Sequence, residues 1–359
     1  MFSADLGVQA AGAPPFTGTQ FLAVGHNNSP FVTAYPWSSS TGFGAKFANP
    51  SQSAPSPARG VAFSPSGNAF ASIGGGSSDG KNPQSFAVSV YPWSVSGFGT
   101  KFSNPALVFP YAEGQGCTFS PSGNVIVMVG TGLTNDSITA YSWSGSGFGS
   151  KFSDPTGSQQ YAYGCAFSPA ENAVAVAHDG PPRITVWAWS GAGFGSKFSN
   201  PSTLPTNAGY TCAFSPSGNA LAVGHATSPF ITVYPWSGSG FGTKFSNPST
   251  LPTNEVNGCA FSPSGDALAT AHVTSPFISV YPWSGSGFGT KFSDPATAVS
   301  GIGRGCAFSP DGLALAVAHS ITPYISAYAW SGSGFGAKFA DPSTLPTNNA
   351  LSCAFGVIP

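Results

Sequence analysis

Five histidines stand once per copy of a repeated unit and are the first candidates for chemistry. A neutral imidazole is a common metal ligand and titrates near neutral pH, so a histidine ring could hold a metal or respond to pH. The spacing disfavours a metal, because glycine replaces the residue in two copies (Gly74 and Gly130) and no carboxylate recurs beside it. We therefore predict that they brace turns by hydrogen bonding, with no metal and no cofactor. They are His26, His178, His225, His272 and His319.

Seven tryptophans also occur once per copy, each closing the same expected strand. A row of indoles could bind sugars, because a pyranose face stacks on an aromatic ring. The alternative is a structural role, in which each indole packs between neighbouring units. We favour packing and keep a multivalent glycan-binding lectin as the alternative function. The residues are Trp37, Trp93, Trp143, Trp189, Trp236, Trp283 and Trp330.

The acidic residues show no catalytic pattern. Asp and Glu number 12 together, are scattered along the chain, and form no recurring acid/base pair beside a nucleophile motif. The sequence therefore predicts no catalytic residues and a protein that is not an enzyme. A site assembled from different units around a central channel is the enzymatic alternative.

The elements that must position these residues belong to a repeat. The tripeptide GFG occurs seven times, and Gly240, Gly287 and Gly334 are spaced 47 residues apart. Within one copy, residues 212–215, 220–225, 230–234 and 243–246 read as four short strands separated by Gly, Pro and Asn turns. A fixed period of this length indicates a repeat architecture, and four strands per unit predict a propeller.

The two chain ends contain complementary parts of one unit. The chain enters the repeat partway through at Thr19, and Cys353 to Val357 form only a first strand. We expect an all-β fold, a seven-bladed β-propeller of four-stranded antiparallel blades over residues 19–359, closed by pairing the C-terminal strand with the N-terminal blade. Residues 1–18 match no copy and are expected to form a flexible or docking arm.

The unit that begins at Cys212, CAFSPSGNALAVGHATSPFITVYPW, resembles the WD-repeat propeller pattern. The shared features are an AFSPDG turn, closest at Ala307 to Gly312, a strand of small residues, and a third strand that ends in an aromatic residue. The resemblance covers residues 19–357 and implies the propeller architecture rather than an activity. The Asp of the WD dipeptide is absent, so the buried Asp–His–Ser/Trp network of that family is not carried over. Its place is taken by Pro36, Pro92, Ser142, Ala188, Pro235, Pro282 and Ala329.

The low-charge, Gly/Ser/Thr-rich repeat is also similar to phage virion or tail-associated proteins.

The composition limits the classes of molecule that are expected to bind this protein. Only 6% of residues are charged, the net charge is −1 and Lys and Arg do not cluster, so nucleic acid is not an expected partner. No run of about 18 apolar residues and no signal-peptide pattern is present, which predicts no membrane insertion and cytoplasmic synthesis, with virion association by the phage resemblance. The six cysteines share one repeat position and are expected to be buried free thiols.

The repeat is irregular in its second to fourth copies, where several connectors differ from the rest. In a propeller these connectors emerge on one face, and loops on a rigid scaffold often carry binding function. The sequence therefore predicts a binding patch, with relaxed drift of surface loops as the alternative. The candidates are Asp79, Lys81, Tyr111, Glu113, Asn135, Asp136, Tyr161, Tyr163, Asp179 and Arg183.

The functional prediction from the sequence is a non-enzymatic binding or structural propeller. We expect it to be a protein-interaction component of a larger assembly such as a phage particle, with protein partners or, in the lectin alternative, glycans. The closed repeat and the absent catalytic cluster motivate this expectation.

Overall fold

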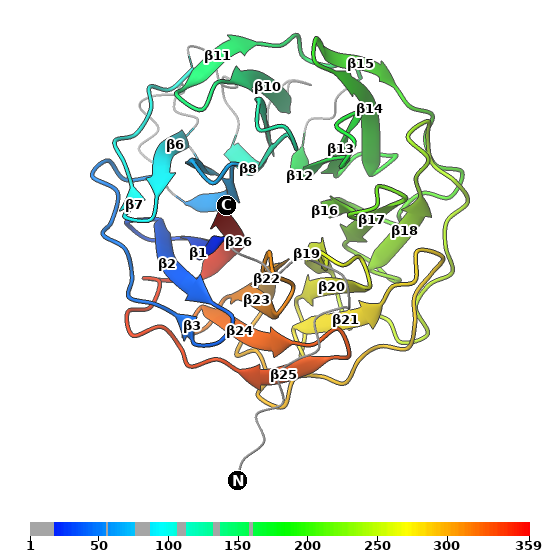
Figure 1. The fold of residues 1–359 in the computed structure, drawn as a ribbon. Coiled ribbons are helices and arrows are strands. Elements are labelled where there is room, and N and C mark those ends of the chain that lie inside the picture. Colours follow the sequence, from blue (N-terminus) through cyan, green and yellow to red (C-terminus); the bar gives the residue numbers. More distant parts are fainter. Residues whose placement is uncertain (1–17, 55–56, 76–86, 106–112, 132–136, 158–160) are drawn as a thin grey trace.

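The computed structural model describes residues 18–54, 57–75, 87–105, 113–131, 137–157 and 161–359. Seven antiparallel sheets stand around a central axis as the blades of a propeller (Figure 1). Together with the absence of helices from the described residues, this confirms the predicted all-β, seven-bladed fold.

Each blade begins with an inner strand at the axis and continues outward. The inner strands are β4 (Ala58–Phe63), β8 (Glu113–Phe119), β12 (Ala162–Phe167), β16 (Gly209–Phe214), β19 (Val256–Phe261), β22 (Gly303–Phe308) and β26 (Ala350–Ile358). The second strands are β1 (Thr19–His26), β5 (Ala69–Gly74), β9 (Val125–Thr131), β13 (Ala173–His178), β17 (Ala220–His225), β20 (Ala267–His272) and β23 (Ala314–His319). The third strands are β2 (Val32–Ser38), β6 (Ala87–Ser94), β10 (Ile138–Trp143), β14 (Ile184–Ser190), β18 (Ile231–Pro235), β21 (Ile278–Pro282) and β24 (Ile325–Trp330).

The core lies between blades. Second strands such as β17, with the sequence ALAVGH, are buried along their whole length because both faces contact a neighbouring blade. Most of their side chains are apolar, as expected of strands buried on both faces, and the histidines that end five of them are buried as well. Between β13 and β17, for example, Ala175 and Val186 pack with Leu221 and Val223.

The length of the outermost strand depends on the residue type at one position of the third strand. Where that residue is Ser142, Ala188 or Ala329, the outer strand is regular, as in β11 (Phe148–Lys151), β15 (Gly193–Lys197) and β25 (Phe335–Lys338). Where it is proline, the outer strand shortens to two residues in β3 (Gly42–Phe43) and β7 (Gly97–Phe98), or to an isolated bridge in the blades of β18 and β21. Proline has no N–H to donate to a ladder, which explains the loss.

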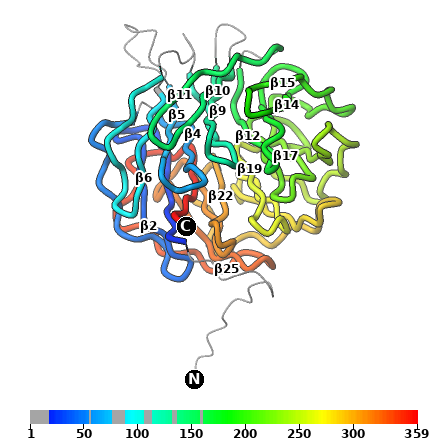
Figure 2. The backbone as a smooth tube through the Cα atoms, turned by 45° about the horizontal axis from the view of Figure 1, so that its top comes forward, coloured from blue at the N-terminus to red at the C-terminus, as the bar shows by residue number. Residues whose placement is uncertain are grey.

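The ring closes by strand pairing, as predicted. β26 runs antiparallel to β1, with Gln20 opposite Val357 and Val24 opposite Cys353. Side chains add a second connection, because Asp311 of the preceding blade accepts hydrogen bonds from Gln20 Nε2 and Ser39 Oγ, both at 2.7 Å. The oblique view in Figure 2 shows the C-terminus near the axis, among the first and last segments of the ring.

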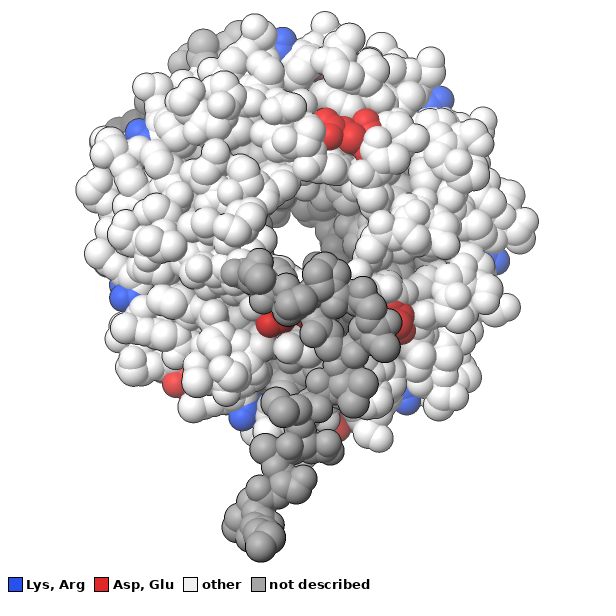
Figure 3. Space-filling view, in the orientation of Figure 1, with Lys and Arg blue, Asp and Glu red and all other residues white. Residues whose placement is uncertain are grey.

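The surface carries little charge. On the face seen in Figure 3, lysine and arginine atoms appear at intervals around the rim, and the centre of the ring is open. No helix among the described residues is long and apolar enough to cross a membrane. The predicted arm, residues 1–18, lies outside the described residues except for Gly18.

Candidate functional site at the mouth of the central channel

The inner strands approach one another closely around the axis because most carry a glycine at the same position. A Cβ atom on Gly60 would lie 2.9 Å from the Cα of Gly116, and one on Gly258 would lie 2.7 Å from the Cα of Gly305. Real Cβ contacts are longer, so only glycine allows neighbouring backbones to pack this tightly. The inner strands therefore pack closely around the central channel. The side chains of the residues that precede the glycines surround a single cavity at the mouth of this channel.

Those side chains form a ring of seven residues, one from each blade, which we call the mouth ring. The residue after this position is Gly in five blades and Thr or Ser in the other two, and the residue before it is Ala, Gly or Val, whereas the position itself carries side chains of very different chemistry. The mouth ring and Glu255 line a cavity of about 330 Å3. Its members are Arg59, Gln115, Tyr163, Tyr210, Asn257, Arg304 and Leu351.

The mouth ring has a cationic side and an aromatic side. The sequence order of the inner strands places Arg59 and Arg304 on the two sides of Leu351. Tyr163 and Tyr210 are contributed by the adjacent strands β12 and β16, across the axis, with an edge-to-face ring contact of 5.4 Å between centroids. A ligand in this cavity would therefore meet guanidinium groups at one end and phenol rings at the other.

Two carboxylates occupy matching positions at the mouth, each two residues before an amide of the ring. Glu113 precedes Gln115 and pairs with Arg59, with 3.1 Å between Oε2 and Nη2. Glu255 precedes Asn257, and its carboxylate forms no ion pair within the described part of the chain. The two carboxylates therefore differ in their partners: Glu113 is paired with arginine, and Glu255 has no cationic partner among the described residues.

The electrostatics of the mouth keep its tyrosines protonated. Burial raises the pKa of Tyr210, and the charge of Glu255 raises it further. Burial also raises the pKa of Tyr163, with a smaller contribution from Asp179. Both phenols can therefore donate hydrogen bonds at neutral pH. The side-chain amide of Asn257 is held in place by a 3.1 Å bond from Nδ2 to the carbonyl of Gly303.

Of the ten predicted binding residues, two lie at the mouth: Glu113, through its ion pair with Arg59, and Tyr163 in the cavity lining. Tyr161 and Asp179 are joined by a 3.1 Å backbone bond beside the mouth, and Arg183 takes part in the adjacent turn. The other five predicted binding residues lie outside the described residues; they are Asp79, Lys81, Tyr111, Asn135 and Asp136.

Sequence reasoning missed Arg59, Tyr210, Glu255 and Arg304. It looked for departures from the repeat in the connectors, whereas these departures lie at or next to the start of the inner strands. The signal was present: two residues before the shared Cys or Val61, the copies read Arg, Gln, Tyr, Tyr, Asn, Arg and Leu while the flanking positions stay small.

The histidines brace turns, as predicted. Each ring Nε2 lies 2.9–3.0 Å from a Thr or Ser hydroxyl of the third strand, as in His225 with Thr232 and His272 with Ser279. Burial lowers the pKa of each of the five to about 4, so they are neutral at physiological pH. No group of three or more potential metal ligands occurs among the described residues.

The cysteines are free, and three of the six are fully buried. Burial raises the pKa of the Cys117, Cys259 and Cys353 thiols to about 12. A thiol with so high a pKa is a poor nucleophile at neutral pH, so the cysteines act as packing residues.

The tryptophan row lies in the core. The seven side chains are only 3–5% exposed, and each packs edge-to-face on phenylalanines of its own and the neighbouring blade. Trp236, for example, contacts Phe198, Phe214 and Phe241. An indole that is covered on both faces cannot stack on a sugar ring, so the structure offers no platform for the lectin alternative.

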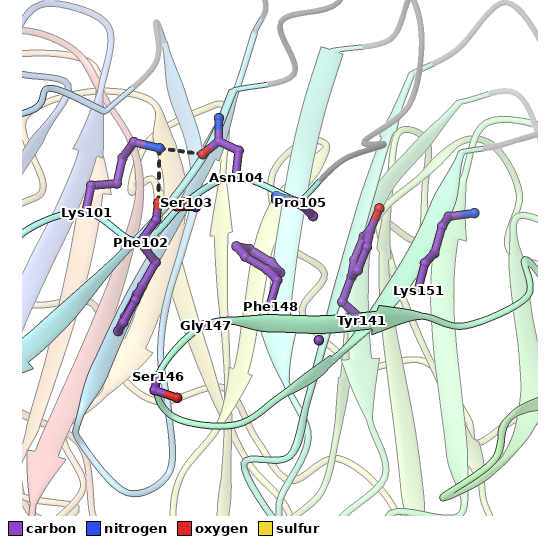
Figure 4. Close-up of a pocket in the computed structure, with 11 residues that line it drawn as sticks. Lys101, Phe102, Ser103, Asn104, Pro105, Tyr141, Ser146, Gly147, Phe148 and Lys151 are labelled. Atoms are coloured by element: carbon purple, nitrogen blue, oxygen red, sulfur yellow. Dashed lines mark hydrogen bonds between the residues drawn. The ribbon is translucent and has the colours of Figure 1, made fainter.

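A larger cavity of about 670 Å3 lies on the outer side of the ring, between residues 101–105 and the strands β10 and β11 (Figure 4). Its two lysines are already engaged. Lys101 donates to the Phe102 carbonyl and to Asn104, and Lys151 pairs with Asp154. Because no free acid or base faces this space among the described residues, the mouth ring is the better candidate site.

Comparison with known proteins gives a fold relationship. No family model matches the sequence, and no curated protein matches it. Among solved structures, the chain is similar to a proposed 6-phosphogluconolactonase from Bacteroides fragilis, with a TM-score of 0.75 and 13% identity over 94% of this chain and 98% of that one. It is also similar to the periplasmic gluconolactonase of Pseudomonas aeruginosa, with a TM-score of 0.72 and 12% identity over 96% of this chain and 100% of that one.

These similarities correct the functional expectation. The prediction of a non-enzymatic binding or structural module, with a lectin as its alternative, is contradicted, because the similar structures carry the names of lactonases. The enzymatic alternative, a site assembled from different units around the channel, was ranked below a non-enzymatic module because no acid/base pair recurs beside a nucleophile motif. A propeller can assemble a site from one residue per blade, so catalytic residues need not be close in sequence.

Proposed function

We propose that this chain is a hydrolase that opens a small lactone or related carboxylic ester in the cavity of the mouth ring. The observation that carries the proposal is the mouth ring itself. One position of an otherwise uniform repeat places two arginines, two tyrosines and two amides around a single cavity, beside two glutamates. The lactonase names of similarly folded structures support the same reaction class.

The chemistry requires a base, a stabiliser of negative charge and a surface that orients the substrate. Glu255 is the candidate base, because its carboxylate is free of ion pairs in the described residues and lines the cavity. It would take a proton from a water molecule as the water oxygen bonds to the lactone carbonyl carbon. The ring C–O bond then breaks, and the proton passes to the leaving ring oxygen, giving a hydroxy acid.

The charge that develops on the carbonyl oxygen needs a donor. Arginine guanidinium groups and phenol O–H groups are suitable, and the mouth contains both. A cavity of about 330 Å3 also matches the lower range of small-molecule sites. Glu113 is less suited to act as the base, because its carboxylate is held in an ion pair with Arg59.

Hydrolysis of glucono-lactone by the purified chain, corrected for the buffer rate, tests the proposal. Glu255→Gln should lower kcat by about 10²- to 10⁴-fold, because it removes the base and keeps the side-chain shape. The matched control is Glu171→Gln, which changes a glutamate bonded to Ser122 in a turn far from the mouth. Hydrolysis at the buffer rate across a panel of lactones and esters would contradict the proposal, as would full activity of Glu255→Gln.

The predictions of a specific family and of a cellular location rest on the sequence alone. WD-repeat likeness and association with a phage particle stay predictions from the repeat pattern. Cytoplasmic synthesis likewise stays a prediction.

A further inference from the structure

The mouth ring contains two positive side chains, but their surroundings differ. Arg59 is paired with Glu113 at 3.1 Å. The Nε atoms of both arginines are buried without a hydrogen-bond partner in the described residues, but only Arg304 forms no ion pair there. Arg304 is therefore the one cation of the described mouth whose charge is uncompensated at contact distance.

Arg304 is partly buried, so an anionic partner would stabilise its charge, and the geometry of the guanidinium favours one kind of anion. Arginine presents parallel N–H groups that match a planar carboxylate in a two-point contact. A carboxylate on Arg304 would leave both the new pair and the Arg59–Glu113 pair neutral. A phosphate dianion would leave a second negative charge, in addition to that of Glu255, without a partner in a partly buried cavity, which is unfavourable.

The opposite wall fixes the other end of the ligand. Tyr163 and Tyr210 form a paired aromatic surface with phenols that remain protonated. The apolar face of a sugar ring packs well against such a surface, while the phenols donate to its hydroxyl groups. Gln115 and Asn257 line the cavity between the two ends and can bond the remaining hydroxyls.

We propose that the mouth ring selects sugar-derived ligands that carry a single carboxylate and disfavours those that carry a phosphate, with Arg304 binding the carboxylate and the Tyr163–Tyr210 pair packing on the sugar ring. The inference rests on the proposed function, since it specifies the substrate class of the same site. It differs from the substrate in the names of the Bacteroides structures, which is phosphorylated.

Three sugars that contain no lactone or carboxylic ester test charge selection independently of turnover. Glucose, glucuronate and glucose 6-phosphate share a pyranose ring and differ at C6 by a hydroxymethyl, a carboxylate or a phosphate group. Dissociation constants would be measured by calorimetry or ligand-observed NMR at fixed ionic strength. We expect glucuronate to bind about 10-fold or more tightly than either of the other two.

Three variants test the charge argument. Arg304→Gln should abolish the preference for glucuronate, whereas Arg59→Gln should reduce it less. Glu113→Gln should free Arg59 and tighten the binding of glucose 6-phosphate by about 10-fold. Glu171→Gln is the matched control for Glu113→Gln and should leave all three affinities unchanged, and the thermal midpoint of each variant reports its folding.

The outcomes separate the two proposals. Tightest binding of glucose 6-phosphate by the unmodified chain, no binding of any of the three sugars, or an unchanged affinity for glucose 6-phosphate in Glu113→Gln would overturn the charge inference. Preferred binding of glucuronate that is lost in Arg304→Gln supports it, even where glucono-lactone is not hydrolysed. Hydrolysis with a preference for phosphorylated lactones would overturn the inference and leave the proposed function standing.

Discussion

The seven inner strands differ at their two ends. At the end away from the mouth ring, six of them lead into nearly identical Ser-Pro turns, and β26 has none. In these turns a serine hydroxyl accepts a hydrogen bond from the amide five residues later, as in Ser215 with Ala220 and Ser262 with Ala267, both at 3.0 Å. At the mouth end, the same strands carry arginine, glutamine, tyrosine, asparagine or leucine. Identical residues at one end fix the geometry of the ring, and different residues at the other provide a set of chemically distinct groups.

This contrast separates two kinds of position. A repeated position meets the same surroundings in every blade, so a side chain that packs well in one blade packs well in all. A position on the channel wall faces its six counterparts across a shared space and is free of that constraint. Recurring positions should therefore control stability, and the mouth ring should control activity.

The largest expected effect on stability comes from acid, through the five recurring histidines. Their folded-state pKa of about 4 lies below the usual 6.5, so on acidification the unfolded chain binds protons first. The contribution of each neutral histidine to the free energy of unfolding is fully present above pH 6.5. It falls by about 3 kcal/mol for each histidine as the pH falls to 4. Chemical denaturation at several pH values measures this slope.

A histidine variant sharpens the test. His225→Gln should flatten the pH dependence by about one fifth, since it removes one of five similar groups and can retain a bond to Thr232. A stability that does not change between pH 6.5 and 4 would refute the assignment of these histidines to the scaffold.

A smaller effect is expected at a single recurring tryptophan. Trp236→Ala should lower the free energy of unfolding by about 3–5 kcal/mol, because the indole is 4% exposed and packs between two blades. At the mouth, Tyr210→Ala should cost far less stability, since its side chain is only partly buried and lines the cavity. Urea denaturation of both variants compares the two regions, and equal losses would break the distinction between them.

Much of the fold was predictable because the sequence contains seven copies of the same strand and turn pattern. The second strand at residues 220–225 and the closure between residues 20–24 and 353–357 were predicted as they occur. The fourth strand was not: residues 243–246 form no regular strand, because Pro235 lacks the N–H that a ladder needs. The sequence contains this proline, but its effect appears only when the blades are compared in three dimensions.

The site was harder to predict, because its residues are separated by whole repeats. Arg59 and Arg304 lie 245 positions apart, and only closure of the ring places them on the two sides of Leu351. The tryptophans and histidines attracted attention because they recur, yet recurrence indicates a scaffold role here. Glu113 and Tyr163 were identified through connectors that happen to lead into the mouth.

The most direct test of the account is a variant in which Arg59, Tyr163, Tyr210 and Arg304 are all replaced by glutamine, the residue that β8 already carries at this position. The quantity to measure is kcat/KM for lactone hydrolysis, together with the thermal midpoint. The account predicts hydrolysis at the buffer rate from a chain whose midpoint changes by only a few degrees, because the ring residues do not pack the core. A folded variant that keeps the activity of the unmodified chain would contradict it.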